Sequence, residues 1–163
     1  MSDGLTVDIT VEDPRWSEVL DLQLLAEAAI AAGLGLLPIT NQHEVSILAA
    51  DDARIAALNA DFRDKSQPTN VLSWPAEELR SSVAGDRPSA PTKAELGDIA
   101  LAFETCRREA AENGVGFHEH VTHLVLHGLL HLLGYDHEED EDATLMQSLE
   151  TQALAQLGVA DPY

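Results

Sequence analysis

Hydrophobic and polar residues alternate along four segments of the chain. In LTVDITVED, the apolar residues Leu5, Val7, Ile9 and Val11 alternate with polar ones, which predicts a strand with one face on a core. HEVSILAA and GDIALAF have the composition of further strands, and TNVLSWPA predicts a short strand that Pro75 ends. The predicted strands span residues 5–13, 43–50, 69–76 and 97–103.

Five other segments have the pattern of helices. Residues 16–32 are rich in Leu, Ala and Glu, and Gly33 is expected to end that helix. Asp51 is a suitable N-cap for the next helix, and Asn113-Gly114 separates two later ones. The predicted helices span residues 16–32, 52–62, 104–112, 117–133 and 140–157.

This order of elements predicts the α+β class. We expect one domain over residues 1–163, with a small mixed four-stranded sheet packed with about five helices. Residues 80–94 contain two prolines and few large apolar side chains, so they predict a flexible loop. The pattern does not predict the order of the strands in the sheet.

Composition limits the cellular setting. The longest apolar run, residues 28–37, is about half the roughly 20 residues that a membrane-spanning helix needs. No Lys or Arg precedes Arg15, and no compact apolar segment follows the start, so we expect no secretory signal. The single Cys106 is interpreted as a small buried hydrophobe. Together these features favour a reducing, cytoplasmic setting without a membrane partner.

The charge of the chain is strongly negative. Nine basic residues against 29 acidic ones give a formal net charge of −20. Such a chain repels polyanions, which argues against tight non-specific binding of nucleic acid. Any activity on RNA or DNA therefore has to depend on a local site.

The segment HGLLHLLGYDH carries the strongest chemical signal. His127 and His131 are four residues apart, so they lie one turn apart on one face of a helix that is apolar nearly all round. Gly134 suits the left-handed position that ends a helix, and the following turn can return His137 to the same face. Three imidazoles with a fourth position open to water are the pattern of a catalytic zinc, one per chain. We interpret three further histidines as structural or supporting residues: His118, His120 and His123.

The same spacing also fits a peptidase. The histidines and the glycine occupy the offsets of the metzincin motif H-E-x-x-H-x-x-G-x-x-H, but Gly128 stands where those proteases carry the general-base Glu. Loss of such a base costs roughly 10²–10⁴ in rate. A metal-dependent hydrolase of another substrate therefore remains the alternative, with peptidase chemistry disfavoured.

HGLLHLLGYDH resembles the signature of the YbeY family, the bacterial single-strand-specific endoribonucleases also called ribosomal RNA maturation factors. LNADFRDKSQPTNVLSWP (residues 58–75) and LGDIAL (residues 96–101) are similar to two further blocks of that family, in the same order. The resemblance implies a small mixed sheet, zinc held by His127, His131 and His137, and hydrolysis of phosphodiester bonds in single-stranded RNA. Ribosomal RNA is the implied substrate, and the small ribosomal subunit is an expected partner.

The family's functionally important arginine corresponds to Arg63. An arginine can hold a phosphate through two parallel hydrogen bonds and stabilise charge in the transition state, so Arg63 is the candidate catalytic residue. Thr69 and Asn70 are candidates for shaping the cleft. Asp136 has two open interpretations: it orients an imidazole, or it stabilises the turn. Water and the ribose 2′-OH both remain possible nucleophiles, and a ribosome-associated protein with a purely structural metal is a third hypothesis.

Overall fold

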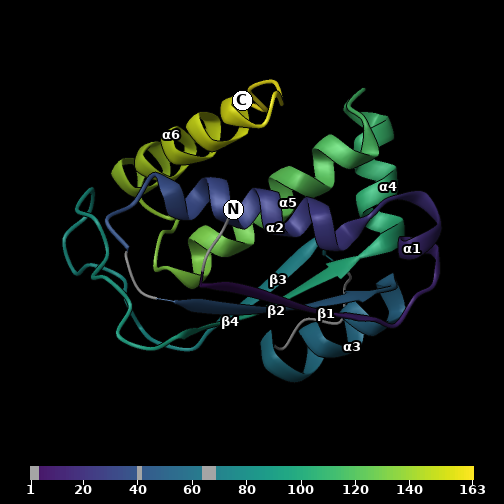
Figure 1. Ribbon diagram of the computed structural model, residues 1–163, viewed down its shortest axis with the longest axis horizontal. Helices are drawn as coiled ribbons and strands as arrows, with labels where there is room; N and C mark the ends of the chain where they lie inside the picture. Colours follow the sequence, from purple (N-terminus) through teal and green to yellow (C-terminus); the bar gives the residue numbers. More distant parts are fainter. Residues whose placement is uncertain (1–3, 40–41, 64–68) are drawn as a thin grey trace.

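The computed structural model describes residues 4–39, 42–63 and 69–163, except for the side chains of residues 61–63. Its strands alternate with helices along the first half of the chain, and helices make up most of the second half (Figure 1). The strands are β1 (Leu5–Val11), β2 (His43–Ala50), β3 (Val71–Pro75) and β4 (Glu95–Ala102). The helices are α1 (Arg15–Val19), α2 (Leu22–Gly35), α3 (Asp52–Arg63), α4 (Phe103–Glu112), α5 (Phe117–Leu132) and α6 (Asp140–Gln156).

The four strands form one mixed sheet in the order β1-β2-β4-β3. β1, β2 and β4 are parallel, and β3 pairs antiparallel with β4 at one edge. Ile9, Ile47, Ile99 and Ser73 lie side by side across this register. The α+β class, the single domain and the small mixed sheet are therefore confirmed, and the structure adds the strand order.

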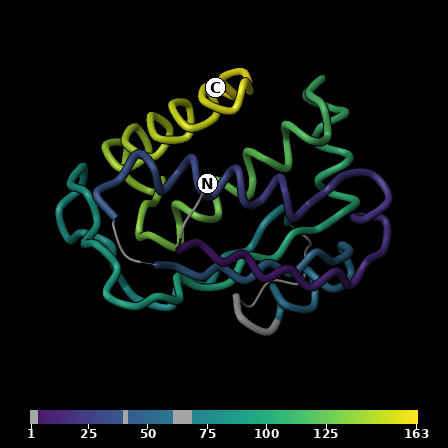
Figure 2. Tube along the Cα trace, in the orientation of Figure 1, coloured from purple at the N-terminus to yellow at the C-terminus, as the bar shows by residue number. Residues whose placement is uncertain are grey.

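The two faces of the sheet have separate cores. Helices α2, α4 and α5 lie over one face, with α6 against α2 and α5, whereas α3 lies on the other face (Figures 1 and 2). Alternation along β2 produces this division, because Val45 and Ile47 point into the larger core while Leu48 and Ala50 point toward α3. The sheet is thus covered on both faces, as expected for strands joined by helical crossovers.

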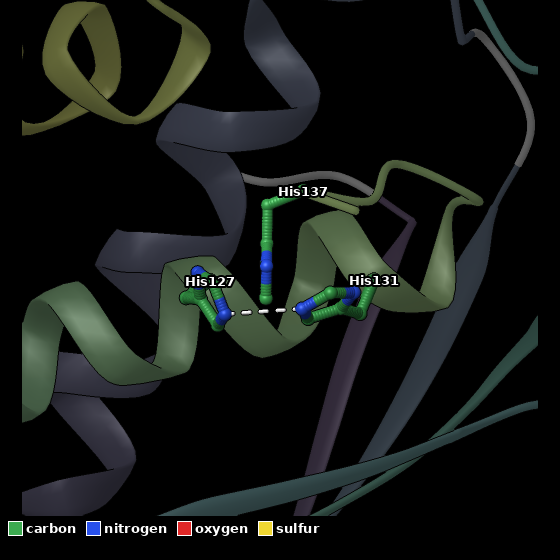
Figure 3. A group of neighbouring side chains, drawn as sticks. All are labelled: His127, His131 and His137. Atoms are coloured by element: carbon green, nitrogen blue, oxygen red, sulfur yellow. Dashed lines mark hydrogen bonds between the residues drawn. The ribbon is translucent and has the colours of Figure 1, made fainter. Parts of the chain in front are cut away.

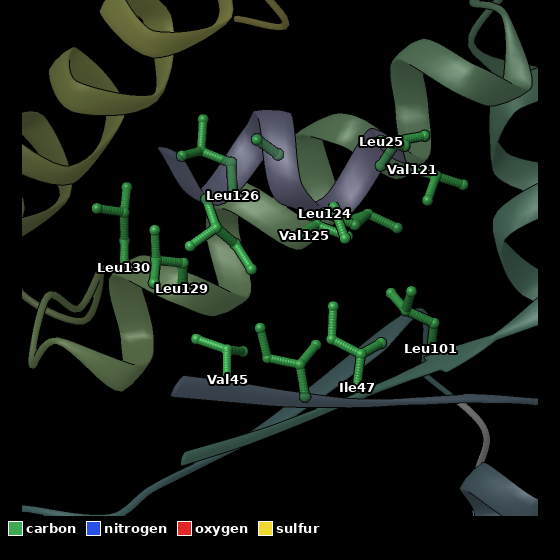
Figure 4. Close-up of a cluster of buried hydrophobic side chains, with 14 of the residues drawn as sticks. Leu25, Val45, Ile47, Leu101, Val121, Leu124, Val125, Leu126, Leu129 and Leu130 are labelled. Carbon is green, nitrogen blue, oxygen red and sulfur yellow. The ribbon is translucent and has the colours of Figure 1, made fainter. Parts of the chain in front are cut away.

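α5 is the central helix of the larger core. Its leucines and valines pack between α2 and the strands (Figure 4). Leu126, Leu129 and Leu130 are 0–1% exposed, and Val125 is fully buried. Burial of several such side chains, at about 1.5–3 kcal/mol each, holds this helix in one position relative to the sheet. The backbone that carries its histidines is therefore held rigidly.

The predicted helix over residues 16–32 is two helices in the structure. Leu20 adopts an extended conformation, and the Asp21 side chain caps α2 by accepting a hydrogen bond from the Leu24 amide at 3.1 Å. This break explains why the described residues form six helices rather than five. α2 also continues past Gly33 to Gly35. No helix among the described residues combines the length and apolar character that a membrane span requires.

Residues 80–94 form a loop, as predicted, and backbone contacts tie it to other segments. The Gly85 amide donates to Asp142 Oδ1 at 2.8 Å, and the Ser89 amide donates to the Leu79 carbonyl at 2.9 Å. Thr92 donates through its amide and its hydroxyl to the Glu77 carboxylate. The flexibility of this loop stays a prediction.

Gly97 allows the close contact between β4 and β3. Its φ is +138°, and a Cβ built at this position would lie 2.2 Å from the Trp74 carbonyl oxygen and 2.9 Å from Leu132 Cδ2. The register between β2 and β4 shifts at the adjoining pair, Glu44 and Val45. A glycine at an irregularity of this kind is typical of a bulge that a side chain would not tolerate.

We therefore expect Gly97→Ala to lower the free energy of unfolding by about 3 kcal/mol or more, because backbone atoms must move and the conformation is strained. Gly35→Ala is the matched control, since a Cβ there meets nothing within 4 Å. Urea unfolding of both variants measures the difference. Equal stability of the two variants would contradict this account of β3 and β4.

Candidate metal centre

The three histidines predicted from the sequence meet at the C-terminal end of α5. His127 and His131 lie on successive turns of the helix, and His137 returns above them from the following turn (Figure 3). One nitrogen from each ring falls within a group whose members all lie within 4.8 Å of one another. The Nε2 atoms of His127 and His131 are 3.0 Å apart. This group of three could hold one metal ion.

The turn after α5 positions His137 through its backbone. Gly134 has a φ of +97°, its amide donates to the His131 carbonyl, and the Tyr135 amide donates to the Leu130 carbonyl, both at 3.0 Å. These bonds are those of a Schellman-type helix end, which needs the left-handed glycine. The helix therefore ends where His137 can fold back.

Asp136 stabilises this turn. Its Oδ1 accepts the His137 amide at 2.7 Å, and its Oδ2 pairs with Arg80 Nη1 at 3.2 Å. Both partners support the second of the two interpretations of Asp136. A Cβ on Gly134 would lie 2.9 Å from the Arg80 amide nitrogen, so the loop and the turn also pack without space between them.

The surroundings of His131 keep that ring neutral. Burial, together with the neighbouring rings of His127 and His137, lowers the pKa of His131 to about 4. A neutral imidazole has a lone pair on one nitrogen, which is the form that binds a metal. At neutral pH, His131 is therefore available as a ligand without first losing a proton.

Glu150, which the sequence analysis missed, supports this cluster from α6. Its carboxylate is completely buried, accepts from His127 Nδ1 at 2.6 Å and from His123 Nε2 at 3.0 Å, and also bonds the Tyr163 hydroxyl. Burial alone would raise the pKa of Glu150, but the hydrogen bonds from His123 and His127 outweigh it and lower the pKa to about 2. Because a carboxylate only accepts, it holds the proton on His127 Nδ1 and leaves the lone pair on Nε2, toward His131.

The sequence did contain a signal for Glu150. It is a charged residue in the buried stripe of α6, which also contains Met146, Leu149, Ala153 and Leu154. A lone carboxylate on such a face needs a buried partner. His123, His127 and Glu150 form a second group that could ligate an ion, but both oxygens of Glu150 are already bonded to imidazoles.

Three further histidines lie outside the cluster of three, and they are His118, His120 and His123. His120 Nε2 bonds Glu109 Oε1 at 3.0 Å, and the same oxygen accepts from Asn70 Nδ2 at 3.0 Å. His118 is exposed. His120 and His123 are therefore supporting residues in the structure, in agreement with their interpretation from the sequence.

The three histidines open into a cleft of about 480 Å³. β3 and the segment after it form one wall, and the end of α5 with its turn forms the other. Thr69 and Asn70 line this cleft, as expected. Arg80 is the one Lys or Arg among its described lining residues, beside carboxylates such as Glu77 and Glu138. Arg63 is the last residue of α3, and its side chain lies outside the described part of the chain.

Gly128 packs against the sheet rather than facing the cleft. A Cβ at this position would lie 3.1–3.3 Å from three side-chain atoms of Ile99, which is itself 1% exposed. The larger side chain of a glutamate would have to enter this occupied space. The helix therefore has neither the residue nor the room for a base in the peptidase position.

Comparison with known proteins identifies the family. The family model described as Endoribonuclease YbeY matches residues 9–158. Curated proteins named Endoribonuclease YbeY are 55% identical in Ruegeria pomeroyi, with 98% of each chain covered, and 53% identical in Jannaschia sp., with 98% of this chain and 100% of the relative covered. One from Bartonella bacilliformis is 41% identical, with 98% of this chain and 97% of the relative covered.

A solution structure of a protein from Thermotoga maritima has the same fold. It superimposes with a TM-score of 0.57 at 22% identity and covers 96% of this chain and 98% of its own. The match to the family model over residues 9–158 and the near-complete coverage of the relatives agree with the three sequence blocks. The chain therefore belongs to the Endoribonuclease YbeY family.

Proposed function

We propose that this protein is a zinc-dependent endoribonuclease that hydrolyses phosphodiester bonds of single-stranded RNA. The observation that carries the proposal is the group formed by His127, His131 and His137 in an open cleft of a chain from this family. Ribosomal RNA is the proposed substrate, the small ribosomal subunit the proposed partner, and the cytoplasm the proposed location.

Zinc fits the donor set of the cleft. Three imidazoles with one position left for water are typical of catalytic zinc sites, whereas carboxylate-rich sites favour Mg²⁺, Ca²⁺ or Mn²⁺. The hydrogen bond from His127 Nδ1 to buried Glu150 is the usual support of a metal-binding histidine. When bound, such a metal supplies an electrophile and lowers the pKa of a bound water toward about 7.

The residues around the three histidines have different proposed roles. Asp136 holds the turn that carries His137, and the buried Glu150 holds His127 in one tautomer. Arg63 is proposed to bind the phosphate through two hydrogen bonds and to stabilise the charge that develops on it. Water and the ribose 2′-OH are both compatible nucleophiles.

The charge of the protein supports a single-stranded substrate. With only nine basic residues in 163, the chain gains little by following a duplex backbone. A flexible strand can bring one phosphate into the cleft while the rest of its charge stays away from carboxylates such as Glu77 and Glu138. Binding is therefore expected to be weak, with a shallow dependence on salt.

The competing functions make different demands on the site. A peptidase needs a general base, and the position after His127 is a glycine packed against Ile99. A purely structural metal needs a closed coordination shell, whereas these histidines line an open cleft. The cleft therefore favours the nuclease over both alternatives.

Purified protein is expected to contain about one zinc per chain, which elemental analysis measures. Replacing His127, His131 and His137 together by Ala should remove it. Glu150→Gln should weaken metal affinity about 10–100-fold, because the amide is a poorer acceptor for His127 Nδ1. Glu141→Gln, an exposed change on the same helix, is the control. Stoichiometric metal in the triple variant would rule out this assignment.

The protein is expected to cut a labelled single-stranded oligoribonucleotide and to leave the annealed duplex and a casein-like peptide intact. His131→Ala assayed in parallel identifies contaminating ribonuclease, since the variant should lose the activity with the metal. Equal cutting by both proteins would assign the activity to a contaminant. Peptide hydrolysis that disappears in the variant would favour the peptidase.

Arg63→Ala is expected to keep the fold and the metal but lose most RNA cleavage. Arg63→Lys should restore little activity, because a point charge does not reproduce two parallel hydrogen bonds. Arg54→Ala is the matched control on the same helix, where Arg54 pairs with Glu12 at 3.3 Å. Thermal melting, metal content and cleavage rate separate the effects, and normal cleavage by Arg63→Ala would return Arg63 to a helix-end role.

A further inference from the structure

A second hollow, of about 430 Å³, adjoins the metal cleft. Asn70 and His127 line both spaces, so they form the boundary between them. The second hollow lies among α4, α5 and the C-terminal segment, and we call it the Tyr163 hollow after the aromatic residue at its side. Glu109, Glu112, Asn113 and His123 also line it.

The chemistry of the Tyr163 hollow differs from that of a phosphate site. Its described lining residues include the carboxylates of Glu109 and Glu112 but no Lys or Arg. A phosphate would meet these two carboxylates there, and Arg108, which pairs with Glu112 at 3.7 Å, does not line the hollow. A neutral group with hydrogen-bond donors and a flat apolar face suits this lining better, and a nucleobase is such a group.

The polar groups of the hollow are already held in place. Glu109 Oε1 accepts from Asn70 Nδ2 and pairs with His120 Nε2, both at 3.0 Å. The Tyr163 ring stands nearly perpendicular to the His123 ring, with centroids 5.7 Å apart, and its hydroxyl bonds buried Glu150. Tyr163 is nevertheless 58% exposed, so much of the side chain remains accessible to a ligand. Groups held in this way lose little entropy when a ligand binds.

We propose that the Tyr163 hollow is a nucleobase subsite, which binds the base next to the scissile phosphate and prefers bases with an exocyclic amino group over uracil. The proposal rests on the proposed function, because it places the scissile phosphate at the three histidines. A strand crossing the Asn70–His127 boundary would put its phosphate in the metal cleft and a neighbouring base beside Tyr163. The preference follows because carboxylates accept hydrogen bonds from the amino groups of cytosine, adenine or guanine and repel the carbonyl oxygen of uracil.

The first test varies the RNA. Single-stranded oligoribonucleotides are made with one abasic nucleotide at each position around the mapped cut, and the protein is used with its own metal. An abasic nucleotide at one flanking position should raise KM about tenfold with little change in kcat, whereas one several nucleotides away should not. Uracil at the flanking position should give a higher KM than cytosine. A KM that does not change when either flanking base is removed or replaced would overturn the proposal.

The second test varies the hollow. Tyr163→Ala should raise KM about tenfold, and Tyr163→Phe should raise KM much less because the ring remains, although the variant loses the hydroxyl bond to Glu150. Glu112→Gln, an exposed change, should reduce the preference for cytosine over uracil, and Glu18→Gln on α1 is the matched control. A Phe variant as impaired as the Ala variant would assign Tyr163 a role through Glu150 and overturn the stacking role. An unchanged base preference in Glu112→Gln would overturn the proposed recognition.

The third test does not require cleavage. Cytidine and uridine are titrated separately into the protein while the imidazole signals of His120 and His123 are followed by NMR. Cytidine should shift these signals at lower concentration than uridine, and the shifts should be lost in Tyr163→Ala. If wild-type protein cuts no RNA, the proposed function fails, whereas absent shifts in a protein that does cut RNA would reject the subsite alone.

Discussion

The burial of α5 is the constraint on which the other features depend. Apolar side chains bind this helix to α2 on one side and to the sheet on the other, and its histidines occupy the remaining face. Because the helix cannot rotate without exposing Leu126 or Leu129, the rings of His127 and His131 have a fixed direction. The rigid part of the site is thus a by-product of core packing.

Glu150 places a charge in that same core. Moving a carboxylate out of water costs several kcal/mol, and only bonded partners offset the cost. Here the partners are imidazoles that belong to the candidate metal centre or adjoin it, together with Tyr163. The packing of α6 on α5 therefore requires the histidines, just as the orientation of His127 requires α6.

The sequence pattern predicts most of the helices and strands. It does not predict the features that depend on contacts between distant residues. β2 occupies the predicted residues 43–50, and α5 lies within one residue of its predicted end, because each has an uninterrupted apolar periodicity. The break at Leu20 depends on a cap, and the strand order depends on contacts between distant segments, so neither follows from periodicity.

The candidate site divides in the same way. The three histidines meet as their spacing predicts, because two share a helix and the third follows its glycine. Glu150 and Tyr163 approach them only through tertiary packing, so their partners could not be named from the sequence. The proposed catalytic role of Arg63 rests on family resemblance alone, because its side chain lies outside the described part of the chain.

The ion pair between Arg80 and Asp136 links the loop after β3 to the turn that carries His137. The geometry of the candidate metal centre therefore depends on tertiary folding. Two of the three nitrogens need only a helix, whereas the third is placed by Asp136, which is itself paired with an arginine more than fifty residues earlier in the chain. The turn that places the third nitrogen is therefore held in part by a long-range contact. Part of the free energy of metal binding is accordingly free energy of tertiary structure, so the ion and the packed loop stabilise each other.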